Sequence, residues 1–65
     1  MKDYKGAIED FTKAIELNPK EFHGYHYRAF SKEKLGDKEG ACKDWKKAAE
    51  LGSQDAKEVI KKYCK

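Results

Sequence analysis

The sequence predicts an all-α fold of about four helices, packed as successive antiparallel hairpins. Apolar residues recur at three- and four-residue steps in four segments, which is typical of amphipathic helices. Gly or Pro separates these segments. In addition, residues 3–17 (DYKGAIEDFTKAIEL) recur 34 positions later as residues 37–51 (DKEGACKDWKKAAEL). A repeat of this length indicates a solenoid of stacked helical units, which bury their apolar faces against one another.

The first predicted helix spans Asp3–Leu17, with Asp3 as its N-cap. Its apolar stripe consists of Tyr4, Ala7, Ile8, Phe11, Ala14 and Ile15. Pro19 ends this helix because proline disfavours a helical conformation in the preceding residue and lacks a backbone N–H. The same proline is expected to open the second helix, since its fixed φ suits a first helical turn.

The second predicted helix spans Phe22–Leu35 and has apolar residues on more than one side. This distribution predicts contacts with two neighbouring helices. Gly36 then stops the helix and Asp37 caps a third one, over Lys38–Leu51. Because the connection is so short, the second and third helices are predicted to form an antiparallel hairpin.

The third predicted helix carries small residues on the same stripe as a tryptophan. Ala41 and Ala48 would let the hairpin partner approach closely, while Trp45 would fill the adjoining space. Gly52 stops this helix, and Ser53 caps a fourth one over residues 54–63, whose charged outer face would close the end of the stack. The predicted repeat core consists of Ala7, Phe11, Ala14, Tyr25, Ala29, Ala41, Trp45 and Ala48.

Composition and charge fit a single small helical domain of 65 residues. With 42% charged and 38% hydrophobic residues, the helices would have a narrow buried stripe and a wide solvated face. The net charge of +3 comes from 15 basic and 12 acidic side chains that are interleaved, which favours a salt-bridged surface over a nucleic-acid-binding one. No segment has the length of a membrane span or the pattern of a signal peptide, so a cytoplasmic location is expected by default.

Two cysteines, Cys42 and Cys64, occupy apolar positions of the third and fourth predicted helices. Such small buried residues are expected to be free thiols in a reducing compartment. The antiparallel order of the two helices could also bring the thiols together, which leaves a disulfide as the alternative.

Motifs for catalysis and metal binding are absent from the sequence. His23 and His26 have a spacing that could direct both imidazoles toward one metal ion, but no obvious third and fourth ligands accompany them. We therefore expect surface or groove-lining histidines and no metal site. The sequence has no nucleophile elbow, phosphate-binding glycine loop or zincin motif, so it predicts neither an enzyme nor a cofactor.

The pattern Ala7-x3-Phe11 followed by Pro19, and its later copy Ala41-x3-Trp45, resembles the tetratricopeptide repeat. This resemblance implies that residues 3–19 correspond to the second helix of a truncated repeat, residues 20–52 to one complete repeat, and residues 53–65 to a capping helix. Residues 45–56 are also similar to Sel1-like repeats.

The first-helix motif of the family departs from its usual form at two positions. Arg28 and Lys32 stand where the family has apolar or aromatic residues. We expect these two side chains to be exposed or to pair with acidic neighbours.

The resemblance implies a non-catalytic protein-interaction module or scaffold that binds a peptide segment or another subunit along its first-helix face. On this chain the corresponding candidates are His23, His26, Phe30, Glu33 and Lys34. An alternative is a homo-oligomer, formed because a first helix is missing before residue 3. Its candidate contacts are Tyr4, Ile8, Phe11 and Ile15. RNA or polyanion association through Lys57, Lys61, Lys62 and Lys65 is the least favoured alternative.

Overall fold

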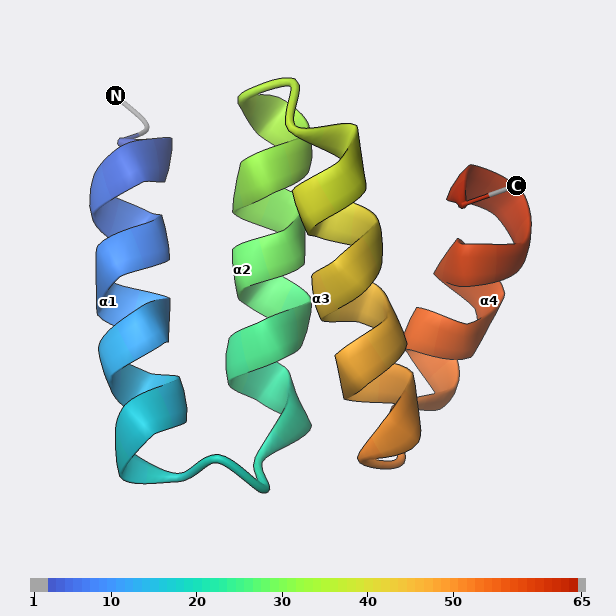
Figure 1. Cartoon of the computed structure of the whole chain (residues 1–65), viewed down its shortest axis with the longest axis horizontal. Coiled ribbons are helices and arrows are strands. Elements are labelled where there is room, and N and C mark those ends of the chain that lie inside the picture. Colours follow the sequence, from blue (N-terminus) through green and yellow to red (C-terminus); the bar gives the residue numbers. More distant parts are fainter. Residues whose placement is uncertain (1–2, 65) are drawn as a thin grey trace.

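The computed structural model describes residues 3–64, and these residues form four helices joined by three short turns. The helices are α1 (Tyr4–Leu17), α2 (Phe22–Lys34), α3 (Lys38–Glu50) and α4 (Gln54–Tyr63). Each helix packs against the next one along the chain and runs in the opposite direction (Figure 1). The predicted all-α hairpin arrangement is therefore confirmed. Within these residues, every helix falls short of the length and apolarity that crossing a membrane requires.

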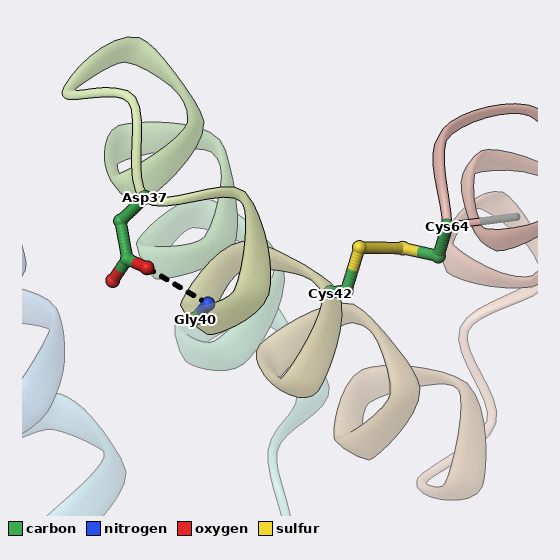
Figure 2. Close-up of a disulfide and its surroundings, with 4 residues drawn as sticks. All are labelled: Asp37, Gly40, Cys42 and Cys64. Atoms are coloured by element: carbon green, nitrogen blue, oxygen red, sulfur yellow. Dashed lines mark hydrogen bonds between the residues drawn. A yellow bond between two sulfur atoms is a disulfide. The ribbon is translucent and has the colours of Figure 1, made fainter.

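Three of the four helices begin at the N-caps that the sequence predicts. The side chains of Asp3, Asp37 and Ser53 each accept a hydrogen bond from the backbone N–H three residues later, at 3.0, 3.0 and 3.1 Å respectively. Figure 2 shows this bond between Asp37 and the backbone nitrogen of Gly40. Each cap satisfies a backbone donor that has no partner inside the helix, which fixes the start of the helix.

Glycine turns end α2 and α3 in the same way. Gly36 and Gly52 have φ values of 87° and 113°, a left-handed conformation that costs glycine little. In both turns, the N-cap of the following helix donates its backbone N–H to a carbonyl in the last turn of the preceding helix. These bonds join Asp37 to Lys32 at 2.9 Å and Ser53 to Ala48 at 3.0 Å. The chain therefore reverses direction within very few residues.

Pro19 does not open α2, contrary to the prediction. The helix begins at Phe22, and its N-cap is Glu21, whose carboxylate accepts a hydrogen bond from the backbone N–H of His23 at 3.1 Å. Pro19 instead lies in a turn that the N–H of Glu21 closes by donating to the carbonyl of Asn18 at 3.1 Å. Because a side chain two residues after the proline supplies the cap, the fixed φ of Pro19 shapes the turn rather than the helix.

The main core lies between α2, α3 and α4 and is made chiefly of small residues around one indole ring. Ala29, Ala41, Trp45, Ala48 and Ala56 are at most 3% exposed. The ring of Trp45 meets that of Tyr63 edge to face, with 5.0 Å between the centroids, and the half-buried Tyr25 packs against the same cluster. The alanines let the helices approach closely, so a single large ring can fill the space that remains.

Ala14 and Ala48 occupy equivalent positions in the two copies of the repeat, but only Ala48 is buried. Ala48 is 0% exposed, but Ala14, which the sequence placed in the core, lies on the surface. The prediction for Ala14 is wrong because, within residues 3–64, α1 has a neighbouring helix on one side only (Figure 1).

This difference in burial predicts that replacing alanine by leucine destabilises the chain by different amounts at the two positions. Ala48→Leu is expected to destabilise the chain by about 1–3 kcal/mol, because the added atoms have no room in the core. Ala14→Leu at the surface should change the unfolding free energy by less than about 0.5 kcal/mol. Urea denaturation of both variants measures the difference, and equal costs would contradict this account of the core.

The α1–α2 contact depends on a glycine that admits a bulky side chain. A Cβ atom at Gly24 would lie 2.8 Å from Cγ1 of Ile15, so only glycine allows this approach without a shift of the isoleucine. Ile15 is consequently buried, at 8% exposure. Nearby, the rings of Phe11 and Tyr27 stack with their centroids 5.6 Å apart.

Cys42 and Cys64 form a disulfide between α3 and the end of α4 (Figure 2). The expectation of free thiols is therefore wrong, and the alternative of a disulfide is correct. The physical reason is the antiparallel return of α4, which places the two Cα atoms 5.8 Å apart although 22 positions separate the residues in the sequence. This Cα separation is one that a disulfide can bridge without backbone movement.

Candidate functional site

All five residues of the predicted partner-binding stripe lie on α2. His23 and Lys34 are exposed, His26 and Glu33 are half-buried, and Phe30 is 48% exposed. Their spacing places them along one side of the helix. The ammonium of Lys34 lies 5.0 Å from the ring centroid of Phe30, close enough for a cation–π interaction. The stripe thus combines a surface aromatic ring with groups that can donate or accept hydrogen bonds.

His23, the first residue of the stripe, interacts with Glu21, the N-cap of α2. The carboxylate of Glu21 contacts the ring nitrogen Nδ1 of His23 and also accepts a hydrogen bond from the backbone N–H of that residue. Two hydrogen bonds lower the pKa of Glu21 below its ordinary value. The larger effect comes from the backbone N–H of His23 and the smaller one from its imidazole. The His23 side chain is thereby held near the start of the helix.

The lowered pKa of Glu21 predicts a pH dependence of the α2 cap. Because the folded-state pKa is depressed, the carboxylate stabilises the fold above its unfolded-state pKa, and this contribution is lost as the pH falls through the folded-state value. An NMR titration of the Glu21 carboxyl carbon should give a pKa below that in a disordered peptide. His23→Ala should keep part of this depression, since the backbone donor remains. A pKa equal to the peptide value would contradict the assignment.

The two histidines of the stripe have different surroundings, although both rings lie near the ring of Tyr27. The Nδ1 atom of His26 is shielded from solvent and has no hydrogen-bond partner among residues 3–64, and its ring meets Tyr27 edge to face at 5.8 Å. The His23 imidazole is instead engaged by Glu21. Within the part of the chain that the structure describes, no three or more His, Cys, Asp and Glu side chains are grouped so that they could hold a metal ion.

A hollow of about 330 Å³ lies between α1 and α2, and the sequence did not predict it. We call it the α1–α2 groove. Its lining combines four aromatic rings with small and polar residues, namely Asp3, Tyr4, Ala7, Phe11, Tyr27, Phe30 and Ser31. Phe30 therefore belongs both to the α2 stripe and to the groove. The sequence could not reveal the groove because its shape depends on how α1 packs on α2.

An ionic network fixes α2 between α1 and α3. The guanidinium of Arg28 donates two hydrogen bonds of 2.8 Å to the carboxylate of Asp44 and one of 3.2 Å to the hydroxyl of Thr12. The ammonium of Lys32 lies 3.1 Å from Asp44 as well. The hydrogen bonds that Arg28 donates to the Asp44 carboxylate raise the pKa of Arg28 above its ordinary value. The sequence left open whether Arg28 and Lys32 are exposed or paired with acidic neighbours. The structure shows that both pair with Asp44.

The candidate self-association residues are less exposed than the sequence suggested. Ile15 is buried against α2, and Tyr4, Ile8 and Phe11 are half-buried. Because α2 packs on α1, these side chains are at least partly covered, and self-association through them stays a prediction. On the other candidate surface, Lys57, Lys61 and Lys62 are exposed on α4, and Lys65 lies outside the described residues.

Comparison with known proteins finds two relatives whose names contain the same repeat. The chain is 32% identical over 62 residues to Small glutamine-rich tetratricopeptide repeat-containing protein 2 of Saccharomyces cerevisiae, covering 95% of this chain and 18% of the yeast protein. It is 38% identical over 52 residues to Tetratricopeptide repeat protein 36 homolog of Nematostella vectensis, covering 80% of this chain and 29% of that protein. The chain thus spans less than a third of either relative.

No family model and no solved structure matches the chain. The similarity to Sel1-like repeats stays a prediction. The 34-residue repeat, the row of antiparallel helices and the two alignments agree, however, on one assignment. The chain belongs to the tetratricopeptide repeat family.

Proposed function

We propose that the chain is a non-catalytic protein-interaction module that binds a peptide segment or a subunit of another protein through the exposed side of α2. The observation that carries this proposal is Phe30, a large aromatic ring that is 48% exposed in the middle of the stripe. Aromatic side chains are prominent among the residues that dominate binding energy at protein interfaces. Membership of the tetratricopeptide repeat family supports the same function, because interaction with proteins is typical of the family.

The stripe is well suited to binding because α2 is held in place before a partner arrives. The helix packs on both sides, against α1 and α3, and Arg28 ties it to both of these helices. A surface that needs no reordering loses little conformational entropy on binding. The partner would bury the ring of Phe30, while His23, Glu33 and Lys34 around it provide polar contacts at the rim.

The small size of the stripe sets an upper limit on affinity. One helix face buries much less than the roughly 800 Å² per partner of a standard interface. We therefore expect this chain alone to bind a peptide with a dissociation constant in the micromolar range or weaker, without chemical turnover.

Peptides selected from a displayed random library of about 12 residues provide the test. Phe30→Ala should weaken the binding of a selected peptide at least about tenfold, because it removes the proposed anchor. The matched control is Leu17→Ala at the end of α1, where an apolar side chain is 88% exposed but lies off the stripe. Equal affinities of the two variants, or NMR shifts on peptide addition that spare His26 and Phe30, would contradict the proposed face.

A further inference from the structure

A hollow of about 330 Å³ lies beside the disulfide that joins α3 to the end of α4 (Figure 2). We call it the disulfide hollow. Its lining combines the two bridged cysteines with four charged side chains, namely Lys38, Glu39, Cys42, Lys43, Lys46 and Cys64. Both cysteines are half-buried and both line the hollow, so a small molecule in it can reach the sulfur–sulfur bond. The volume is near the lower end of the range for ligand pockets.

Positive charge predominates in the lining of the disulfide hollow. Three lysines against one glutamate leave a formal charge of +2. Lys38 and Lys46 lie four residues before and after Cys42, which places all three on one face of α3. The ammonium of Lys38 also lies 5.3 Å from the ring centroid of Tyr63, the residue before Cys64. All three lysines are exposed, and the salt bridges among residues 3–64 involve other residues, so the lining attracts an anion toward the disulfide.

We propose that the disulfide hollow is a site of S-thiolation by a small thiol that carries a carboxylate. The carboxylate lies among the lysine ammonium groups, and the thiolate sulfur of the same molecule attacks Sγ of Cys64. A bond forms between these two sulfurs and the bond between Cys42 and Cys64 breaks. The electron pair of the broken bond leaves on Sγ of Cys42, which then takes up a proton from water. In all, the reaction adds one thiol molecule to the chain and needs no other reactant.

The arrangement of charges selects Cys64 as the sulfur that is attacked. In thiol–disulfide exchange the bond breaks more readily when the departing thiolate is stabilised, and neighbouring lysine ammonium groups stabilise a thiolate. All three lysines of the hollow belong to α3, the helix that carries Cys42. Cys42 is therefore the better leaving group, and the incoming thiol stays on Cys64. After the reaction, the turn at Gly52 is the remaining covalent connection between α3 and α4.

Three small thiols that differ in the group at the end of a two-carbon chain test the role of charge. Of these, 3-mercaptopropionate is anionic, 2-mercaptoethanol is neutral and cysteamine is cationic. Acid quenching and mass spectrometry follow their reaction with the intact disulfide-bonded chain. Each rate per thiolate is divided by the rate of the same thiolate with an uncharged small disulfide, which removes differences in intrinsic nucleophilicity.

The corrected rates should follow the charge of the thiol. At an ionic strength of about 10 mM, where the Debye length is about 30 Å, the anionic thiol should react about tenfold faster than the cationic one, with the neutral thiol between them. At about 1 M salt the Debye length is about 3 Å, so this ratio should fall toward one.

Lysine variants assign the effect to the disulfide hollow. Lys43→Gln with Lys46→Gln leaves one lysine and one glutamate in the lining, so the ratio of the anionic to the cationic rate should fall to within about twofold of one. The matched control, Lys5→Gln with Lys13→Gln, makes the same change in overall charge at two exposed positions of α1. It should keep the ratio within about twofold of the wild-type value. A general loss of stability would not change the ratio, because both thiols attack the same bond.

Peptide mapping of the chain that has gained one thiol, trapped early by acid quenching, should place that thiol on Cys64. Three results would overturn the proposal. The first is equal corrected rates for the three thiols at low ionic strength. The second is an equal fall of the ratio in the two lysine variants, which would indicate attraction by the overall charge of the chain. The third is the added thiol on Cys42. Since the disulfide hollow lies on α3 and α4, none of these results bears on the proposed α2 stripe.

Discussion

Replacing Asp44 by alanine is expected to destabilise the chain by about 3–5 kcal/mol, the cost of removing one partner of a buried ion pair. Asp44 is 5% exposed, and its carboxylate accepts two hydrogen bonds from the Arg28 guanidinium, with the ammonium of Lys32 at 3.1 Å. Without it, two cations that are 18% and 22% exposed would remain in the interior without this acceptor. Small domains have folding free energies near the lower end of about 5–15 kcal/mol, so this variant should lose most of its stability.

Urea denaturation followed by the fluorescence of Trp45 measures this effect. The control is Asp10→Ala, the same substitution at the equivalent repeat position, where the carboxylate is exposed. It should change the unfolding free energy by less than about 0.5 kcal/mol. Equal costs for the two variants would show that the network contributes no more than a surface charge does.

A second variant separates the loss of the pair from the loss of packing. Replacing both partners by apolar residues, as in Arg28→Met with Asp44→Leu, removes the Arg28 charge together with its acceptor, so that only Lys32 loses a partner. Such replacements are often close to neutral in other proteins. The double variant should therefore be more stable than Asp44→Ala alone.

Reduction of the Cys42–Cys64 disulfide is expected to cost about 3 kcal/mol of unfolding free energy, the value for a closed loop of this length. The two cysteines lie 22 positions apart, and the loop contains the whole α3–α4 turn. The bond joins the last residue of the α4 region to α3, while Tyr63 packs on Trp45 beside it. Without the bond, α4 should separate from α3 more readily, because its remaining contacts are the small buried side chain of Ala56 and partly buried residues such as Val59 and Ile60.

Urea denaturation with and without a reducing agent tests this expectation. The Cys42→Ala, Cys64→Ala variant serves as the control, since its stability should match that of the reduced wild type and should not respond to the reductant. Mass spectrometry should show a gain of two hydrogen atoms on reduction of the wild type. An unchanged mass, or an unfolding free energy that is the same in both conditions, would contradict the disulfide or its stabilising role.

Local sequence signals determined where the helices begin and end. Asp3, Asp37 and Ser53 cap helices at the predicted positions, and Gly36 ends α2 at the predicted turn. These features depend on hydrogen bonds between residues that are close in sequence, so composition and spacing suffice to predict them. The sequence did not predict Glu21 as the N-cap of α2, because glutamate is not among the usual N-cap residues. The structure shows this role in the hydrogen bond that Glu21 accepts from the backbone N–H of His23.

The sequence predicted which residues make up the α2 stripe, but it did not predict what surrounds them. Helical spacing places Phe30 and Lys34 together, whereas the groove beside Phe30 exists only because α1 lies against α2. The pairing of Arg28 with Asp44 likewise joins residues 16 positions apart on different helices. Such contacts depend on the rotation of each helix about its own axis, which the hydrophobic pattern specifies only approximately.

By itself, the sequence determined an all-α chain of repeated helices with defined ends, and the family resemblance that the alignments support. The tertiary structure decided which members of each repeated pair are buried. Asp10 and Asp44 occupy equivalent positions, yet one is solvated on the surface and the other is an acceptor for Arg28 in the interior. Their local sequences are alike, but burial depends on whether a neighbouring helix covers the position. Within residues 3–64, α3 packs against both α2 and α4, whereas α1 lies at the end of the row and packs against α2.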